Sequence, residues 1–392
     1  MPGRDSERRV DLAKRLARKG PRKLLAIDGG GIRGVLSLQI LGRIEEILVK
    51  ESKRPDYRLA DYFDYVAGTS TGGIIAAGIA LGMSVAEILD FYMRNGAAMF
   101  DKASITQRLR YEYNSEPLAK QLKSVFGEDT TLGAKELECL LLLVMRNATT
   151  DSPWPLSNNP FAKYNDPAHP TCNTKLPLWQ LVRASTAAPT YFPPEVIMCG
   201  GKPFIFVDGG VTMYNNPTFQ MFLMATVDRY WINAPPENRG WETGTDKMLI
   251  ISVGTGTSPG ENYSLKPNEM NLLFNATTIP SALMYAALNE QDLLCRVFGD
   301  CVAGHILDRE VDKMSRSAGP LRQKLFRYIR YNAELTKQGL TALGCGDVDP
   351  EVVQKLDSVD GIPSLERVGK AAAQRQVDDT HFNFEVFQPR PP

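Results

Sequence analysis

The stretch Leu24-Leu-Ala-Ile-Asp-Gly-Gly-Gly-Ile-Arg-Gly34 decides the fold class. Its first four residues are apolar, as is typical of a short buried strand, and a glycine-rich turn follows them. From Val35 to Leu48 the apolar residues recur at the spacing of an amphipathic helix. A strand, a tight turn and a helix in succession are the building block of parallel sheets, so these residues predict an α/β fold.

The same plan repeats further along the chain. Tyr62–Ala67 predicts a second strand, a turn with glycines at 68 and 72 follows, and Ile74–Leu81 predicts a helix. Further strands are predicted at Cys139–Met145, Phe204–Val207 and Met248–Val253, and further helices at Ser84–Asn95, Leu178–Ser185, Ile279–Phe298, Asp349–Asp357 and Ser364–Ala373. The proline-rich stretch Asp151–Thr174 predicts a loop, and the chain from Tyr328 onward predicts polar helices. This alternation predicts a largely parallel sheet with helices on both faces.

The composition is that of a globular protein and weighs against several classes of function. Of the 392 residues, 43% are apolar and 23% are charged, and 45 Lys and Arg residues balance 45 Asp and Glu residues. A neutral chain gives no electrostatic case for binding a nucleic acid polymer. The six cysteines form no CxxC pair, and no stretch reaches the ~18 apolar residues of a membrane-spanning helix. Because the N-terminus also lacks the apolar centre of a signal peptide, we expect a cytoplasmic protein with reduced thiols and no metal site.

The glycine-rich turn is a candidate anion-binding site. Gly29, Gly31 and Gly34 match the G-x-G-x-x-G pattern of dinucleotide-binding folds, but that function needs an acidic residue at the end of the second strand. The chain at residues 50–55 predicts a loop instead. Backbone N–H groups at a helix N-terminus also stabilise an oxyanion. The predicted oxyanion hole consists of Gly29, Gly30, Gly31 and Arg33, with Gly34 supporting the turn.

Ser70 is the candidate nucleophile. Gly68-Thr69-Ser70-Thr71-Gly72 matches the G-x-S-x-G pattern, in which small residues allow a sharp turn from a strand into a helix. Such a turn exposes the serine hydroxyl at the carboxyl edge of a sheet. We therefore expect Ser70 to attack an acyl carbon, with Gly68 and Gly72 shaping the turn.

A serine nucleophile needs a general base within hydrogen-bond reach. The chain has three histidines, His169, His305 and His381, and no predicted strand positions any of them. Asp208 follows the predicted strand Phe204–Val207 and precedes Gly209 and Gly210, so it too lies at the carboxyl end of a strand. The residues alone leave two arrangements open, a Ser70–Asp208 pair or a triad that includes His381.

Three motifs in this order resemble those of the patatin-like phospholipases: Asp28 to Gly34, Gly68 to Gly72, and Asp208 to Gly210. The resemblance covers Leu24–Pro217 and includes Asn215-Asn216-Pro217. It implies a three-layer α/β sandwich with a mainly parallel central sheet. It further implies a Ser70–Asp208 dyad without histidine, an oxyanion hole in the glycine loop, and chemistry that requires no cofactor or metal.

The resemblance also suggests a division of the chain. Residues 1–22 are a basic N-terminal lead-in, 23–220 the patatin-like catalytic core, 221–327 the completion of the α/β domain with a candidate lid helix, and 328–392 a helical C-terminal region and candidate regulatory element. The C-terminal part is similar to bacterial soluble members of the family, some of which are immune effectors switched on by a cyclic nucleotide.

These features lead to an expected function. We expect a phospholipase that releases fatty acids from membrane phospholipids during transient contact with the inner membrane surface, activated by a cyclic dinucleotide in antiviral defence. Two alternatives remain at this stage. One is an ungated acyl hydrolase or thioesterase, and the other is a lipid-binding or storage protein without activity. The sequence does not indicate the oligomeric state.

Overall fold

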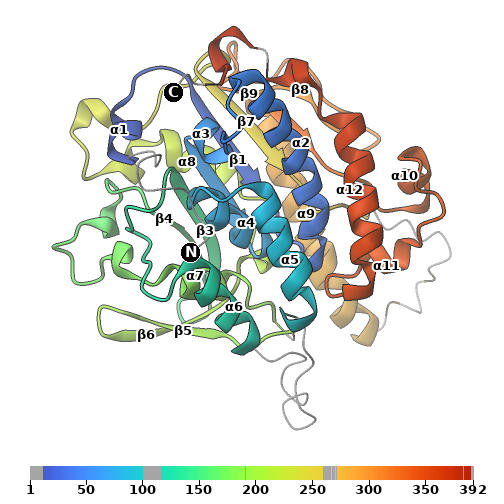
Figure 1. Cartoon of the computed structure of the whole chain (residues 1–392), viewed down its shortest axis with the longest axis horizontal. Coiled ribbons are helices and arrows are strands. Elements are labelled where there is room, and N and C mark those ends of the chain that lie inside the picture. The colour runs from blue at the N-terminus through green and yellow to red at the C-terminus, as the bar shows by residue number, and fades with distance from the viewer. Residues whose placement is uncertain are drawn as a thin grey trace.

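In the computed structural model, residues 12–99, 116–189, 191–258, 266, 270, 272–382 and 384–389 are described. They contain a nine-stranded sheet with helices on both faces, as Figure 1 shows. The strand order is β5-β6-β3-β2-β1-β7-β9-β8, and β4 pairs with β3 outside this path. This architecture confirms the predicted three-layer α/β fold. No helix in the described ranges is both long and apolar enough to cross a bilayer.

The centre of the sheet is parallel. The strands are β1 (Arg22–Ile27), β2 (Tyr65–Thr69), β3 (Leu140–Asn147), β4 (Ser152–Ser157), β5 (Glu195–Cys199), β6 (Lys202–Asp208), β7 (Met248–Val253), β8 (Asp300–Ala303) and β9 (Arg327–Tyr331). Strands β3, β2, β1, β7, β9 and β8 run parallel, whereas β4, β5 and β6 form antiparallel pairs at one side. The central strands are buried and mainly apolar because helices cover both of their faces.

Two layers of helices cover the sheet. The helices are α1 (Leu12–Ala17), α2 (Gly34–Ser52), α3 (Leu59–Tyr62), α4 (Thr71–Ala80), α5 (Val85–Met99), α6 (Glu116–Phe126), α7 (Leu178–Ser185), α8 (Thr218–Thr226), α9 (Leu272–Phe298), α10 (Lys337–Ala342), α11 (Pro350–Gln354) and α12 (Ile362–Gln376). Alternate residues of β1 face opposite layers: Leu25 belongs to the apolar cluster that contains residues of α2, α4 and α12, and Leu24 to the one that contains residues of α8 and α9. One continuous core therefore lies on each face of the sheet.

Most predicted elements are present with shifted ends, and one predicted loop is wrong in part. The strand at Met248–Val253 and the helix at Leu178–Ser185 have the predicted bounds. The predicted loop Asp151–Thr174 contains β4, which pairs with β3 through Pro153 and Pro155. Proline lacks an N–H donor, but a strand with one neighbour does not need it on its free edge. Because of these prolines, the sequence pattern predicted a loop where the structure has an edge strand.

The prediction that the chain is helical from Tyr328 onward is also wrong for its first residues. Arg327–Tyr331 forms β9, and Arg330 is buried within the sheet. The two arginines interrupt the apolar pattern by which a strand is recognised. An ion pair with Asp28 compensates for the burial of the Arg330 charge. Strand β9 crosses the boundary between residues 327 and 328, where the sequence suggested that the C-terminal region begins. The division of the chain into four regions stays a prediction. Residues 1–11 of the predicted lead-in lie outside the described residues.

Candidate active site

Ser70 lies in a sharp turn between β2 and α4. Its backbone has φ 56° and ψ −124°, a conformation that non-glycine residues rarely adopt. The turn is tight, because a Cβ atom on Gly68 would lie 2.0 Å from the carbonyl oxygen of Gly72, and one on Gly72 would lie 2.3 Å from that of Ile27. The Ser70 N–H donates to Ser185 Oγ at 2.9 Å. Both predicted glycines are therefore required to hold this strained turn.

Asp208 is the last residue of β6 and meets Ser70. The end of β6 pairs with the end of β3, which places Asp208 beside the carboxyl end of β2. Ser70 Oγ donates to Asp208 Oδ2 at 2.5 Å, and the Gly210 N–H donates to Asp208 Oδ1 at 2.6 Å. Gly209 is required for close packing, since a Cβ there would lie 2.3 Å from the Val144 carbonyl oxygen. The structure thus joins two residues that are 138 positions apart.

The environment of Asp208 tunes its carboxyl group. Asp208 is 5% exposed, and burial raises its pKa to about 6. The hydrogen bonds from Ser70 and Gly210 and the nearby Arg183 guanidinium partly oppose this rise. The carboxyl group is therefore ionised at neutral pH, and its pKa lies near the range that suits a general base.

The three histidines lie away from this pair. His169 Nδ1 contacts the Thr171 hydroxyl, and His381 Nδ1 contacts the Tyr331 hydroxyl at 2.7 Å. His305 is largely enclosed, and burial lowers its pKa to about 4. None of the three histidines, all of which are described, hydrogen-bonds to Ser70 or Asp208. The geometry therefore favours the pair over a triad with His381.

The glycine loop adjoins Ser70, but not all of its N–H groups are free. A Cβ on Gly29 would lie 3.2 Å from Ser70 Cβ. The Gly29 N–H donates to the Asn215 carbonyl oxygen at 3.0 Å, so the expectation that Gly29 supplies an oxyanion donor needs correction. The N–H groups of Gly30 and Gly31 have no acceptor among the described residues. The predicted oxyanion hole narrows to these two donors.

Arg33 and Gly34 complete the loop. Arg33 belongs to the short 3₁₀ helix η2 (Gly31–Arg33), and its Nε donates to the Gly30 carbonyl oxygen at 3.4 Å. Burial lowers the pKa of Arg33 to about 10, which leaves the side chain charged at neutral pH. A Cβ on Gly34 would lie 2.5 Å from Thr71 Oγ1, so glycine there allows α2 to start against the Ser70 turn.

A buried ion pair that the sequence did not reveal holds the start of the loop. Asp28 immediately precedes the glycines, and Arg330 on β9 binds both of its carboxylate oxygens, at 2.9 and 2.5 Å. Arg330 also donates to Ser252 Oγ on β7 at 2.7 Å. Asp28 and Arg330 are almost completely buried, and leaving either unpaired would be strongly destabilising. The only sequence signal for this contact was Arg330, a charged residue between the apolar residues of β9.

The ion pair continues into α9. Asp292 binds Arg296 through two hydrogen bonds of 2.8 and 2.9 Å, and its Oδ2 lies 3.9 Å from Arg330 Nε. The same helix approaches the turn after Asp208, because a Cβ on Gly210 would lie 3.6 Å from Met284 Cε. Helix α9 therefore contacts both the Asp208 turn and the group that anchors the glycine loop.

Asn215 is a second residue with no role predicted from the residues themselves. Its Oδ1 is buried without a hydrogen-bond partner among the described residues. The same atom lies 2.3 Å from the place of a Cβ on Gly29 and 3.0 Å from that on Gly210. The side chain thus lies between the glycine loop and the Asp208 turn, with a polar atom that no hydrogen bond within the described residues satisfies.

A model of the family described as patatin-like phospholipase matches residues 25–222. The chain belongs to the patatin-like phospholipase family. As a member of it, the chain is a carboxylic ester hydrolase of the phospholipase class. The described residues contain no group of three or more His, Cys, Asp or Glu side chains placed to hold a metal ion.

Two bacterial relatives of this patatin-like phospholipase are named cGAMP-activated phospholipases. The one from Vibrio cholerae is 31% identical over 63% of this chain and 67% of its own length, and the one from Escherichia coli is 30% identical over 63% and 64%. Among solved structures, human GIVD cytosolic phospholipase A2 matches with a TM-score of 0.42 and 13% identity, over 93% of this chain and 60% of that chain.

Proposed function

We propose that this enzyme releases fatty acids from membrane phospholipids, with Ser70 as nucleophile and Asp208 as general base. The 2.5 Å hydrogen bond from Ser70 Oγ to Asp208 Oδ2, at the carboxyl edge of the sheet, carries this proposal. The test is fatty-acid release from phospholipid vesicles, measured by mass spectrometry with the wild-type protein and with Ser70→Ala. Release by both proteins at the same rate would refute the assignment, and release by neither, with or without a cyclic dinucleotide, would point to lipid binding without catalysis.

In the proposed reaction, Asp208 accepts the hydroxyl proton while Ser70 Oγ bonds to the acyl carbonyl carbon. The carbonyl oxygen becomes an oxyanion, which the N–H groups of Gly30 and Gly31 stabilise beside the positive charge of Arg33. When the tetrahedral intermediate collapses, the ester C–O bond breaks and Asp208 returns the proton to the departing alcohol. Water then attacks the acyl-serine by the same route, which releases the fatty acid and restores Ser70.

Activity should depend on pH through Asp208. Below its pKa of about 6 the carboxyl group already carries a proton and does not accept that of Ser70, so kcat/KM should rise with pH and level off above about 6. The measurement is hydrolysis of a soluble ester between pH 4.5 and 8. Because the Arg183 charge lowers the pKa of Asp208, Arg183→Met should move the midpoint to higher pH, whereas Arg183→Lys should largely preserve it. A rate independent of pH below 6 would contradict the proposed base.

We also propose that a cyclic dinucleotide activates the enzyme. The names of the two bacterial relatives support this, and so does a contact between the C-terminal region and the glycine loop. The Leu356 carbonyl oxygen, between α11 and α12, accepts a hydrogen bond from the Ile32 N–H at 2.8 Å. The same oxygen lies 2.2 Å from the place of a Cβ on Gly31, whose φ of 58° also favours glycine. A shift of this segment would therefore reorient the proposed oxyanion donors.

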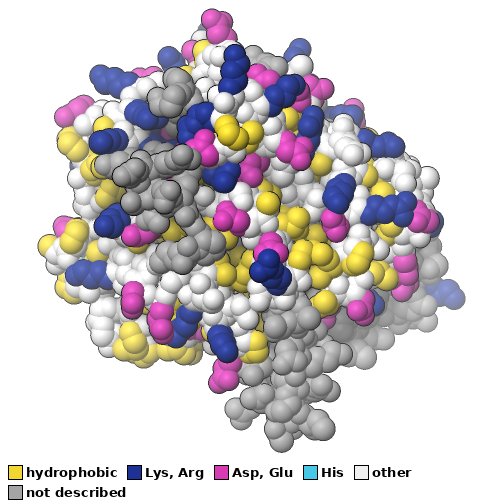
Figure 2. Space-filling view, in the orientation of Figure 1, with side chains coloured by type: hydrophobic (Ala, Val, Ile, Leu, Met, Phe, Trp, Pro, Cys, Tyr) yellow, Lys and Arg dark blue, Asp and Glu magenta, His cyan; other side chains and the backbone are white. Residues whose placement is uncertain are grey.

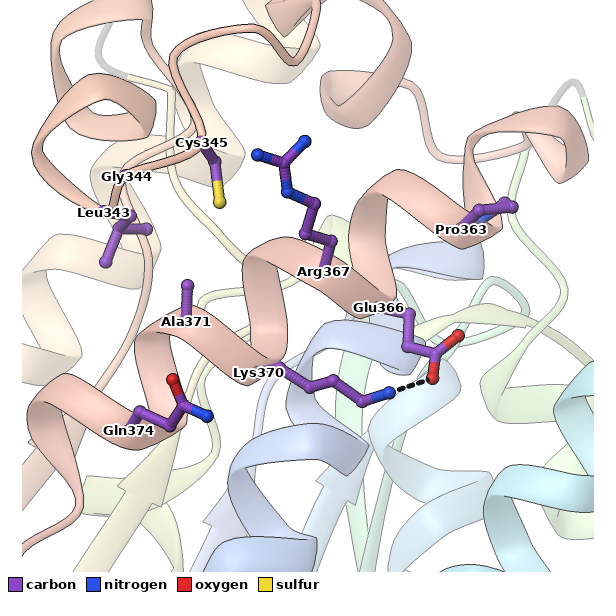
Figure 3. A pocket seen from close by; sticks show the side chains of 9 residues that line it. All are labelled: Leu343, Gly344, Cys345, Pro363, Glu366, Arg367, Lys370, Ala371 and Gln374. Atoms are coloured by element: carbon purple, nitrogen blue, oxygen red, sulfur yellow. Dashed lines mark hydrogen bonds and ion pairs between the residues drawn. The ribbon is translucent and has the colours of Figure 1, made fainter.

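A pocket of about 440 Å³ between α10 and α12 is our candidate for the activator site (Figure 3). Its lining includes Arg367 and Lys370 on α12, which form ion pairs with Asp347 and Glu366 respectively. When a dinucleotide binds, Arg367 and Lys370 would leave their carboxylate partners and bind the phosphates of the dinucleotide instead. Helix α12 packs on α2, and α2 begins at the end of the glycine loop, so the pocket is mechanically connected to the active site.

Purified protein should have low basal activity on phospholipid vesicles, and one cyclic dinucleotide should raise this activity at least about tenfold. A ligand that binds the active state more tightly than the inactive state by about 1.4 kcal/mol shifts the equilibrium between them by that factor. The concentration needed for half-activation should rise in Arg367→Ala and in Lys370→Ala. The matched control is Lys50→Ala, at an exposed lysine of α2 that is paired with Asp379 outside the pocket. High activity without ligand, unchanged across a panel of cyclic nucleotides, would eliminate the gated enzyme.

A further inference from the structure

The hairpin of β5 and β6 has an exposed apolar face. Val196 is 51% exposed, Met198 56% and Ile205 45%. Val196 lies directly opposite Ile205 on the neighbouring strand, and Met198 lies opposite Pro203. These four residues, which we call the docking face, form two adjacent cross-strand pairs on one side of the hairpin.

Packing within the fold does not account for the exposure of these apolar side chains. The opposite side of the hairpin already packs into the protein: Ile197 and Phe206 are buried, and Phe206 lies against Trp154 with ring centres 5.1 Å apart. An antiparallel hairpin with one buried face normally presents polar residues on the other. The docking face therefore suits a contact outside the chain.

The hairpin projects from the edge of the sheet that carries the active site. Strand β6 pairs with β3 only through its last three residues, Phe206–Asp208, and the rest of the hairpin extends beyond the carboxyl end of β3. Figure 1 places β5 and β6 at the lower left, and Figure 2 shows apolar side chains along the same edge. Two further apolar residues, Val211 and Met213, follow closely after Asp208 and are 41% and 48% exposed. Exposed apolar side chains thus flank the proposed base on both sides along the chain.

We propose that the docking face inserts into the surface of a phospholipid bilayer, an inference that rests on the proposed phospholipase function. The substrate's ester bonds lie at the level of the bilayer where partly buried apolar side chains reside. From Val196 to Val207 the only charged residue is Lys202, which is exposed at the free end of the hairpin. Lys202 lies opposite Cys199, on the other side of the hairpin from the docking face, so the docking face itself carries no charge and suits lipid chains. Docking there would bring Asp208, at the end of the same strand, to the membrane.

The test is sedimentation with vesicles of phosphatidylethanolamine and phosphatidylglycerol, in a Ser70→Ala background that prevents hydrolysis. Met198→Ser combined with Ile205→Ser should lower the vesicle-bound fraction at least about tenfold, since each side chain loses apolar area that would enter the bilayer. The matched control is Val386→Ser. Val386 is 47% exposed, and it lies in the 3₁₀ helix η11 (Glu385–Phe387), where Phe387 contacts Tyr62 near the amino end of β2. The control should bind vesicles like the parent.

With Ser70 intact, the double variant should lose vesicle hydrolysis relative to hydrolysis of a soluble short-chain ester, again about tenfold. Unaltered vesicle binding by a folded double variant would overturn the docking proposal. So would a wild-type dimer that the double variant converts to a monomer, because a second copy would then occupy the face. Absence of ester hydrolysis by the wild-type protein, tested with and without a panel of cyclic nucleotides, would instead refute the phospholipase function, while sedimentation would still report on docking.

Discussion

Ser70→Ala is expected to reduce hydrolysis of phospholipid vesicles and of soluble esters at least about a thousandfold, because it removes the atom that forms the acyl-enzyme. The fold should persist. Alanine keeps the Cβ atom, and the Ser70 N–H bond to Ser185 involves only the backbone of residue 70. The measurement is the initial rate of fatty-acid release, with thermal unfolding as the check on folding.

Ser185→Ala is an informative comparison for this variant. Its hydroxyl accepts from the Ser70 N–H and donates to the Val144 carbonyl oxygen, so its loss should weaken the turn without removing the nucleophile. We expect a partial decrease in rate for Ser185→Ala and an essentially complete one for Ser70→Ala. Wild-type rates in a folded Ser70→Ala protein would disprove the assignment of the nucleophile.

Asp208→Asn should lower kcat on the order of 10²-fold or more, because the amide preserves the shape of the side chain but does not accept the serine proton. The hydrogen bond from the Gly210 N–H to Oδ1 can persist in this variant, which isolates the loss of the base. The rise of activity through pH 6 should disappear as well, since the group responsible for it is gone. Rates of soluble-ester hydrolysis across the pH range measure both effects.

The histidines provide the control for a Ser70–Asp208 pair. His169→Ala, His305→Ala and His381→Ala should each retain substantial turnover, because none of these side chains contacts Ser70 or Asp208. A folded histidine variant as inactive as Ser70→Ala would replace the pair by a triad.

The parallel strands β1, β2, β3 and β7 were predictable because each contains a run of apolar residues. Met248–Val253 is such a run, and its bounds were predicted without error. Strands with interrupted patterns were missed. β4 contains two prolines, which only its edge position allows, and β9 contains Arg330, whose partner Asp28 is 302 residues away. A local sequence pattern does not show that a buried charge such as that of Arg330 is neutralised by a residue so far away in the chain.

The candidate site shows the same limit. The sequence pattern placed Ser70 and Asp208 each at the carboxyl end of a strand, and the family resemblance paired them; in the structure the two side chains are hydrogen-bonded. The loss of Gly29 as a donor was not predictable, since its N–H is taken by the backbone carbonyl of Asn215, far along the chain. The contact of Leu356 with the loop likewise depends on how the C-terminal helices pack. Sequence motifs therefore located the proposed reacting groups, and long-range packing determines which neighbouring groups are available to them.

We propose that Ser70 is the nucleophile and that Asp208 activates it. The most direct measurement is labelling with a fluorophosphonate, followed by peptide mass spectrometry of the wild-type, Ser70→Ala and Asp208→Asn proteins. We predict one covalent adduct on Ser70 in the wild type, none in Ser70→Ala, and labelling slowed on the order of 10²-fold in Asp208→Asn. An adduct on a different residue would contradict the assignment of the nucleophile, and equally rapid labelling of Ser70 in Asp208→Asn would contradict the assignment of the base.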